Sequence, residues 1–138
     1  MSKQSRSNKK RTSQNIRVEA NSIRTLRTLS NNEGFHFYEN INKPTGQSAN
    51  SLNEFLEKIK SIELQSLVFH LGRNDFSNWI ADKLEDPTLA RRIQMIPKEN
   101  NNELRTKMQA TIETRLRELE NNTVPIVETS TMHALPLP

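Results

Sequence analysis

Apolar residues recur at helical spacing through the middle of the chain, and the clearest case begins at Ser51. Leu52, Phe55, Leu56 and Ile59 lie at positions i, i+3, i+4 and i+7, which places them on one face of a helix. Ser51 and Glu54 stand at the spacing of a capping box, in which each side chain bonds a free N–H group at the helix start. The pattern predicts a helix that begins at Ser51.

Three further helices are predicted between residues 64 and 96. Their apolar positions are Leu64, Leu67, Val68 and Leu71, then Phe76, Trp79, Ile80 and Leu84, then Leu89, Ala90, Ile93 and Ile96. Gly72 is expected just past the end of the first of these helices, in the left-handed conformation typical of that position. Asn74 or Asp75 is expected to cap the second helix. Asp86 caps the third, with Pro87 at its first position.

A longer helix is predicted from about Asn102 to Glu120. Its apolar residues are Leu104, Met108, Ile112, Leu116 and Leu119, at spacings of four, four, four and three. A coiled-coil seam alternates spacings of three and four, so this stripe drifts around the helix. It is therefore expected to pack on its own domain.

The first third of the chain has weaker patterns. Ile16, Ala20, Ile23 and Leu26 favour a helix from about Asn15 to Ser30, and Phe35–Tyr38 is typical of a short aromatic strand. Lys43–Gly46 is expected to be a turn, with Pro and Gly at suitable positions. No strand partner is evident, so Phe35–Tyr38 either pairs with an unidentified piece or packs as an extended arm.

These patterns predict a mostly α fold of four to five packed helices, with a short aromatic strand or extended arm near the start. The expected organisation is a disordered basic tail over residues 1–14, a basic amphipathic helix or linker over 15–32, a single helical domain over 33–121 and a disordered tail over 122–138. Such tails are too polar to bury enough surface to order themselves, and they explain a mean hydropathy of −0.80.

Composition narrows the classes of function. The chain has no cysteine, which excludes disulfides, a thiolate nucleophile and cysteine-ligated metal. It has no apolar run long enough to span a membrane and no secretory leader pattern at its start. A cytoplasmic protein without a membrane association is therefore expected.

Positive charge is concentrated at the start of the chain. Residues 1–32 hold eight basic residues and one acidic residue, whereas the remainder holds twelve basic and fifteen acidic residues. The basic residues that precede the first acid are Lys3, Arg6, Lys9, Lys10, Arg11 and Arg17. This basic arm is a candidate site for nucleic acid, or for an acidic protein, bound through charge rather than base stacking because it lacks aromatic residues. The alternative is a solvated tail without a partner.

The segments Phe35-His36-Phe37-Tyr38, Ser66-Leu67-Val68-Phe69-His70, Asp75-Phe76-Ser77-Asn78-Trp79-Ile80 and Asp86-Pro87-Thr88-Leu89-Ala90 occur in this order. Together they resemble a family of small archaeal and bacterial domains of unknown function, over roughly residues 35–96. The resemblance implies a mostly helical intracellular domain. It brings no activity, cofactor or catalytic residue.

Four polar residues form the candidate binding surface: His36 in the aromatic strand, and His70, Arg73 and Asp75 in the hinge around Gly72. His36, His70 and Asp75 also allow a metal or acid–base site as an alternative, although their spacing is not that of a zinc site. Phe76 and Trp79 suit either the core or an exposed stacking platform. No nucleophile motif or phosphate loop is present.

These observations favour a non-enzymatic binding or regulatory module with a basic arm for a polyanion, and no cofactor or metal is expected. The alternatives are a small enzyme or metal-binding domain built on the two histidines, and a structural domain that dimerises through Leu104–Leu119. The sequence leaves open whether the protein is a monomer or a homodimer.

Overall fold

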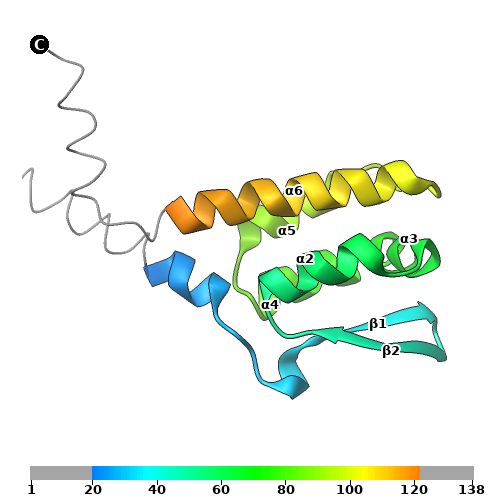
Figure 1. Cartoon of the computed structure of the whole chain (residues 1–138), viewed down its shortest axis with the longest axis horizontal. Coiled ribbons are helices and arrows are strands. Elements are labelled where there is room, and N and C mark those ends of the chain that lie inside the picture. Colours follow the sequence, from blue (N-terminus) through cyan, green and yellow to red (C-terminus); the bar gives the residue numbers. More distant parts are fainter. Residues whose placement is uncertain (1–19, 122–138) are drawn as a thin grey trace, which may run out of the picture.

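The computed structural model describes residues 20–121, which are mostly helical with one β-hairpin (Figure 1). A helix at residues 20–26 leads to the short 3-10 helix η1, Asn31–Glu33, and then to the hairpin strands β1, Phe35–Asn40, and β2, Lys43–Ala49. Five helices follow: α2, Leu52–Ser61; α3, Leu64–Gly72; α4, Asp75–Asp82; α5, Pro87–Gln94; and α6, Asn102–Asn121.

The described elements form three layers. The helix α2 contacts both β2 and α6, and α3 contacts both β1 and α6, so these two helices lie between the hairpin and the long helix (Figure 1). The helices α4 and α5 pack on each other and connect α3 with α6. The hairpin therefore covers one side of the helical core rather than standing apart from it.

The helix starts agree with the capping signals in the sequence. The Ser51 hydroxyl accepts a hydrogen bond from the Glu54 N–H at 3.2 Å, and the Glu54 carboxylate accepts one from the Asn50 N–H at 2.8 Å. At α5 the Asp86 carboxylate accepts from the Leu89 N–H at 3.2 Å, and Pro87 occupies the first turn. These bonds satisfy N–H groups that have no partner within the helix.

An aromatic cluster fills the space between the hairpin and the helices. Its members, all buried, are Phe35, Phe37, Phe55, Phe76 and Trp79. The Trp79 indole Nε1–H donates to the Glu33 carbonyl at 2.8 Å, which satisfies its one polar atom. Phe76 and Trp79 therefore belong to the core and do not form an exposed stacking platform.

The apolar stripe of α6 faces the interior of the same chain. Leu104, Met108, Ile112, Leu116 and Leu119 are all buried, and α6 contacts α2, α3 and α5. Dimerisation through this stripe would require the domain to open, so the described fold leaves no free seam there for a second copy.

The predicted fold class is correct in its main feature, but two details are wrong. Residues 20–121 contain six α-helices rather than four to five. The turn expected at Lys43–Gly46 is wrong, because Lys43–Ala49 is β2 and the turn lies at Ile41 and Asn42. The strand at Phe35 is confirmed, and β2 is the partner that the sequence did not identify.

The irregularity of β2 explains why its sequence did not indicate a strand. Phe35 pairs with Ala49 and His36 with Ser48, but Tyr38 pairs with Pro44, so extra residues of β2 lie between the paired positions. Gly46, with φ of 81°, stands in this irregular stretch. Pro and Gly are depleted in regular strands, and a two-stranded edge with a bulge tolerates both.

The first helix turns inward only part of the face that its apolar residues predict. Of that predicted stripe, Ile16 lies outside the described residues, Ala20 and Ile23 are exposed, and Leu26 packs partly buried against the core. Ser22 and Thr25 are buried instead, beside Asp86 and Arg115. The inward face of this helix is therefore formed by Ser22 and Thr25 together with Leu26.

Gly72 does not adopt the expected left-handed conformation. It is the last residue of α3, and a Cβ atom built on it would meet nothing within 4 Å. The left-handed residue is Asn74, with φ of 63°. Asn tolerates this region better than most residues other than Gly because its short polar side chain can bond locally.

We expect Gly72→Ala to raise the free energy of unfolding by about 0.4–1 kcal/mol, since it reduces the freedom of the unfolded chain without a clash. Asn74→Ala should lower it by about 1 kcal/mol because Ala disfavours positive φ. Urea unfolding measures both, with Asn74→Gly as the control that should keep or improve stability. Destabilisation by Gly72→Ala together with no effect of Asn74→Ala would contradict this assignment.

Candidate functional site

An open cavity of about 380 Å³ lies where β1, the hairpin turn, the end of α3 and the start of α4 meet. Its walls include His36, His70, Arg73 and Asp75, the four residues that the sequence analysis singled out, together with Phe35, Tyr38, Ile41 and Phe69. The structure thus brings the four residues together around one hollow, although His36 lies far from the other three in the sequence.

His70 forms the floor of this cavity and is 4% exposed. Its Nε2 atom accepts a hydrogen bond from the backbone N–H of Tyr38 at 2.8 Å. Its Nδ1 atom lies 2.9 Å from a carboxylate oxygen of Asp75. Because Nε2 is the acceptor, it carries no proton. The proton of the ring is on Nδ1, which donates a hydrogen bond to Asp75, so the imidazole is neutral.

Burial lowers the pKa of His70 below its ordinary value of 6.5, because the charged imidazolium is poorly solvated there. The hydrogen bond to Asp75 and the negative charge of that carboxylate act in the opposite direction, and the charge of Arg73 again lowers the pKa. The net direction agrees with the geometry, since a protonated Nε2 would point its N–H at the Tyr38 N–H.

The same geometry restricts what His70 can do chemically. A general base needs a free ring nitrogen, and a metal ligand needs a free lone pair, but Nε2 is bound to the Tyr38 amide and Nδ1 to Asp75. Within residues 20–121 no group of three or more His, Asp or Glu side chains is placed to hold a metal ion. The arrangement is that of a structural bridge between β1, α3 and α4.

Arg73 forms one side of the cavity mouth. Its Nε lies 3.1 Å from the same Asp75 oxygen that accepts from His70, and its guanidinium carbon lies 4.9 Å from the centre of the Phe69 ring. These two contacts fix the position of the guanidinium, while the side chain remains 52% exposed. A planar cation held in this way presents its remaining N–H groups in a fixed direction.

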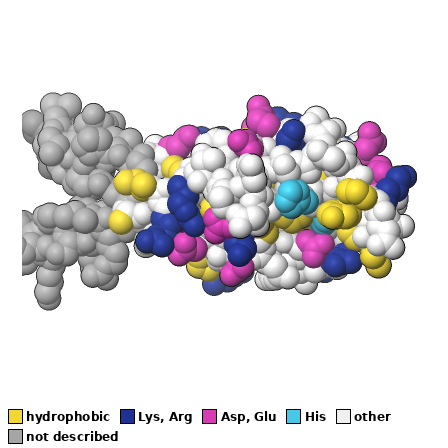
Figure 2. Space-filling view, turned by 90° about the horizontal axis from the view of Figure 1, so that it is seen from below, with side chains coloured by type: hydrophobic (Ala, Val, Ile, Leu, Met, Phe, Trp, Pro, Cys, Tyr) yellow, Lys and Arg dark blue, Asp and Glu magenta, His cyan; other side chains and the backbone are white. Residues whose placement is uncertain are grey.

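The outer wall of the cavity is largely apolar. Ile41 at the hairpin turn is 66% exposed, and Tyr38 and Phe69 are partly exposed. His36 is exposed on β1, in contrast to His70. On the face shown in Figure 2, histidine side chains lie beside hydrophobic side chains, with acidic and basic side chains next to them.

The sequence analysis missed the residues that give the cavity its apolar character, namely Phe35, Tyr38, Ile41 and Phe69. Phe35 and Tyr38 were recognised only as strand residues. Ile41 had no signal of its own, because its exposure follows from a hairpin turn whose position was not predicted. Phe69 stands in the helix just before His70, and its contact with Arg73 is an i, i+4 pair at the end of α3, a spacing that the sequence does show.

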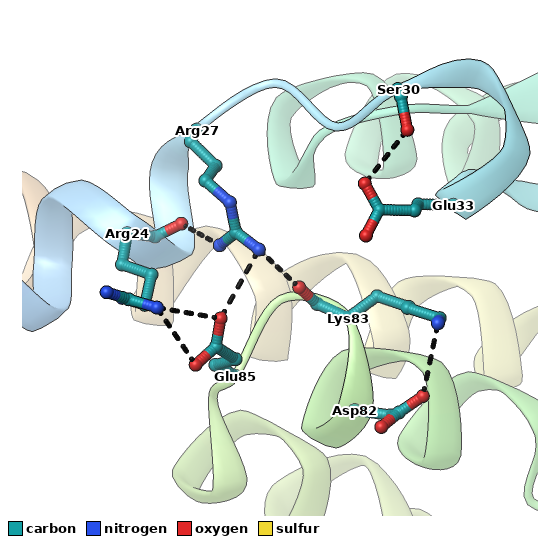
Figure 3. Close-up of polar contacts among 7 residues, drawn as sticks. All are labelled: Arg24, Arg27, Ser30, Glu33, Asp82, Lys83 and Glu85. Carbon is teal, nitrogen blue, oxygen red and sulfur yellow. Dashed lines mark hydrogen bonds and ion pairs between the residues drawn. The ribbon is translucent and has the colours of Figure 1, made fainter.

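The residues proposed for polyanion binding, Lys3, Arg6, Lys9, Lys10, Arg11 and Arg17, all lie outside the described residues. The two arginines that follow them in the chain are engaged with the folded part. Arg24 and Arg27 both reach the Glu85 carboxylate, at 3.4 and 3.3 Å, and Arg27 also donates to the Lys83 carbonyl at 3.0 Å (Figure 3). Their two positive charges are therefore partly compensated by one carboxylate.

A second polar bridge joins α5 to α6 away from the cavity. Asp86, which is 2% exposed, accepts from Arg115 Nε at 2.9 Å and from Nη2 at 3.1 Å. Arg115 Nη1 also donates to Glu118 at 2.9 Å, and Arg92 donates to the same carboxylate. The hydrogen bonds from Arg92 and Arg115 lower the pKa of Glu118.

Comparison with known proteins supports the resemblance to a family of unknown function. A family model described as a family of unknown function (DUF5752) matches residues 72–131. This segment overlaps the second part of the stretch on which the resemblance was recognised. A search of curated proteins and a search of solved structures each found no match. Among the helices of residues 20–121, none is both long and apolar enough to cross a membrane.

We expect the stability of the fold to fall as the pH drops below about 6.5. Since the pKa of His70 is lowered in the folded state, the unfolded chain takes up the proton first. The contribution of His70 is fully present above pH 6.5 and is lost as the pH falls through the folded-state pKa. Denaturant unfolding between pH 7.5 and about pH 5 measures this dependence.

The control is His70→Gln, whose side-chain oxygen can still accept from the Tyr38 N–H but cannot titrate. Its stability at pH 7.5 should be lower than that of the wild type, with a smaller change between pH 7 and 5. An equal pH dependence in the two proteins would show that His70 is not the responsible group.

Proposed function

We propose that this chain is a non-enzymatic binding module that holds a partner protein at the cavity and attaches to a polyanion through its basic arm. The observation that carries the proposal is the composition of the cavity. An exposed apolar side chain, Ile41, and a fixed guanidinium, Arg73, stand over a floor in which the imidazole of His70 is fully hydrogen-bonded.

This combination favours binding over catalysis. Exposed apolar groups beside a few well-placed polar groups are typical of recognition surfaces. A catalytic site would instead need a titratable group that faces the cavity with a free lone pair, and both ring nitrogens of His70 are occupied. His36 is exposed but has no carboxylate partner to orient it among the described residues.

The basic arm supports the second part of the proposal. Six basic residues precede the first acidic residue, whereas residues 20–121 contain equal numbers of basic and acidic residues. Positive charge on a segment of this kind attracts phosphate backbones by counterion release. The folded part, which carries no net charge of its own, would then be concentrated at a nucleic acid or another polyanion.

The cavity is tested by Ile41→Ser in the full chain. The control is Met95→Ser, which also removes an exposed apolar side chain, because Met95 is 78% exposed and lies in a different hollow between α5 and α6. In parallel affinity captures, partners bound through the cavity should be retained by the wild type and by Met95→Ser and lost by Ile41→Ser. The same set of retained proteins on all three would contradict a role for the cavity.

The arm is tested by changing Lys3, Arg6, Lys9, Lys10, Arg11 and Arg17 to Gln. Gel-shift assays with RNA and duplex DNA at two salt concentrations should show binding by the wild type that weakens steeply with salt, and little binding by the variant. A second variant, with residues 2–17 in shuffled order, keeps the charge and should bind like the wild type. Undiminished binding by the Gln variant would rule out the arm.

A further inference from the structure

Arg73 and Arg115 each place Nε beside a carboxylate oxygen, and Arg115 also uses its other two guanidinium nitrogens. Arg115 binds Asp86 through Nε and Nη2 and binds Glu118 through Nη1, so its guanidinium is shared between two carboxylates. Its side chain is only 16% exposed. The chain thus contains an example in which one guanidinium accommodates two carboxylates on different edges.

Arg73 has only the Nε part of the first contact, as a single ion pair, and lacks the second contact. Its Nε lies 3.1 Å from Asp75, but its two terminal amino groups have no hydrogen-bond or ion-pair partner among residues 20–121. The stacking on Phe69 keeps the guanidinium from turning freely. The edge formed by Nη1 and Nη2 is therefore a preorganised fork, which matches a carboxylate with two parallel hydrogen bonds.

The negative charge of Asp75 does not prevent a second carboxylate from binding. The same Asp75 oxygen lies near both His70 Nδ1 and Arg73 Nε, so two donors already compensate it inside the fold. An incoming carboxylate would meet the opposite edge of the guanidinium. At Arg115 two carboxylates contact different parts of one guanidinium, with Arg92 as a second cation on Glu118.

The surroundings of this fork are apolar. Ile41, at 66% exposure, Tyr38 and Phe69 line the same cavity of about 380 Å³. A ligand that fits must therefore offer an apolar group next to its carboxylate. Because Ile41 stands at the tip of the hairpin, the apolar contact continues outside the cavity, which suits a protein segment better than a small molecule.

We propose that the cavity binds a segment of a partner protein in which an Asp or Glu side chain stands next to an apolar side chain. The carboxylate is bound by Nη1 and Nη2 of Arg73, and the apolar side chain packs on Ile41 and Phe69. This inference rests on the proposed binding function and specifies its ligand.

The test uses immobilised full-length protein and two matched pools of acetylated and amidated hexapeptides. One pool places Glu beside two randomised apolar residues, and the other has Gln in place of Glu. Captured peptides are quantified by mass spectrometry. We expect the wild type to capture about ten times more peptide from the Glu pool than from the Gln pool. The reason is that Gln cannot form the charge-assisted hydrogen bonds that Glu forms with Arg73.

Two variants separate Arg73 from general charge effects. Arg73→Gln should bring the ratio of captured Glu to Gln peptides near one. Arg91→Gln removes the same charge from an exposed position of α5 outside the cavity and should leave the ratio unchanged. Both variants retain the basic arm. If the arm caused the preference for Glu peptides, the ratio of captured Glu to Gln peptides would therefore stay high in Arg73→Gln.

Three results would overturn the inference. Equal capture of both pools by the wild type would show a peptide site without carboxylate recognition, and the proposed binding function would stand. Capture of neither pool would count against the cavity itself. Hexanoate, titrated by NMR as a small carboxylate with an apolar tail, should bind more weakly than the selected peptides, and tighter binding would identify a small-molecule site instead.

Discussion

The imidazole of His70 is the contact on which the hairpin, the cavity and its mouth all depend. It joins the backbone of β1 to the last turn of α3 and the first turn of α4, through Tyr38 N–H on one side and Asp75 on the other. Within residues 20–121 the sheet has two strands, so this β1 amide has no third strand there as a partner. A buried N–H without an acceptor is costly, and His70 supplies that acceptor. The same bridge holds Asp75 in place, and Asp75 in turn fixes Arg73.

Local chemistry made the helices predictable. Each of the capping groups Ser51, Glu54 and Asp86 accepts from a backbone N–H within four residues of itself, and apolar spacing reveals the buried face of α6 without knowledge of its neighbours. The strand β2 and the left-handed Asn74 could not be predicted in this way. The pairing of β2 depends on a bulge and on contacts with α2, and Gly72 was the more usual candidate for positive φ.

The candidate site was predictable only in part, for a similar reason. His70, Arg73 and Asp75 are close in sequence, and their residue types suggested a polar cluster. The acceptor role of His70 depends on a backbone N–H of Tyr38, 32 positions away, and a backbone group leaves no trace in a sequence. The difference between His36 and His70, one exposed and one buried, likewise follows from the strand register. The sequence therefore indicated these polar residues, but it did not show that His70 is buried and structural whereas His36 and Arg73 are exposed.

The most direct test of this account is the protonation state of His70, observed by nitrogen NMR of the full-length protein labelled at the histidine rings. At pH 7.5 the account predicts a neutral ring with the proton on Nδ1 and an unprotonated, hydrogen-bonded Nε2. This form should persist as the pH is lowered past 6.5, the ordinary pKa of histidine. A proton on Nε2, or a ring that is already an imidazolium at pH 7.5, would mean that His70 does not accept from Tyr38, and the bridge that organises the site would be absent.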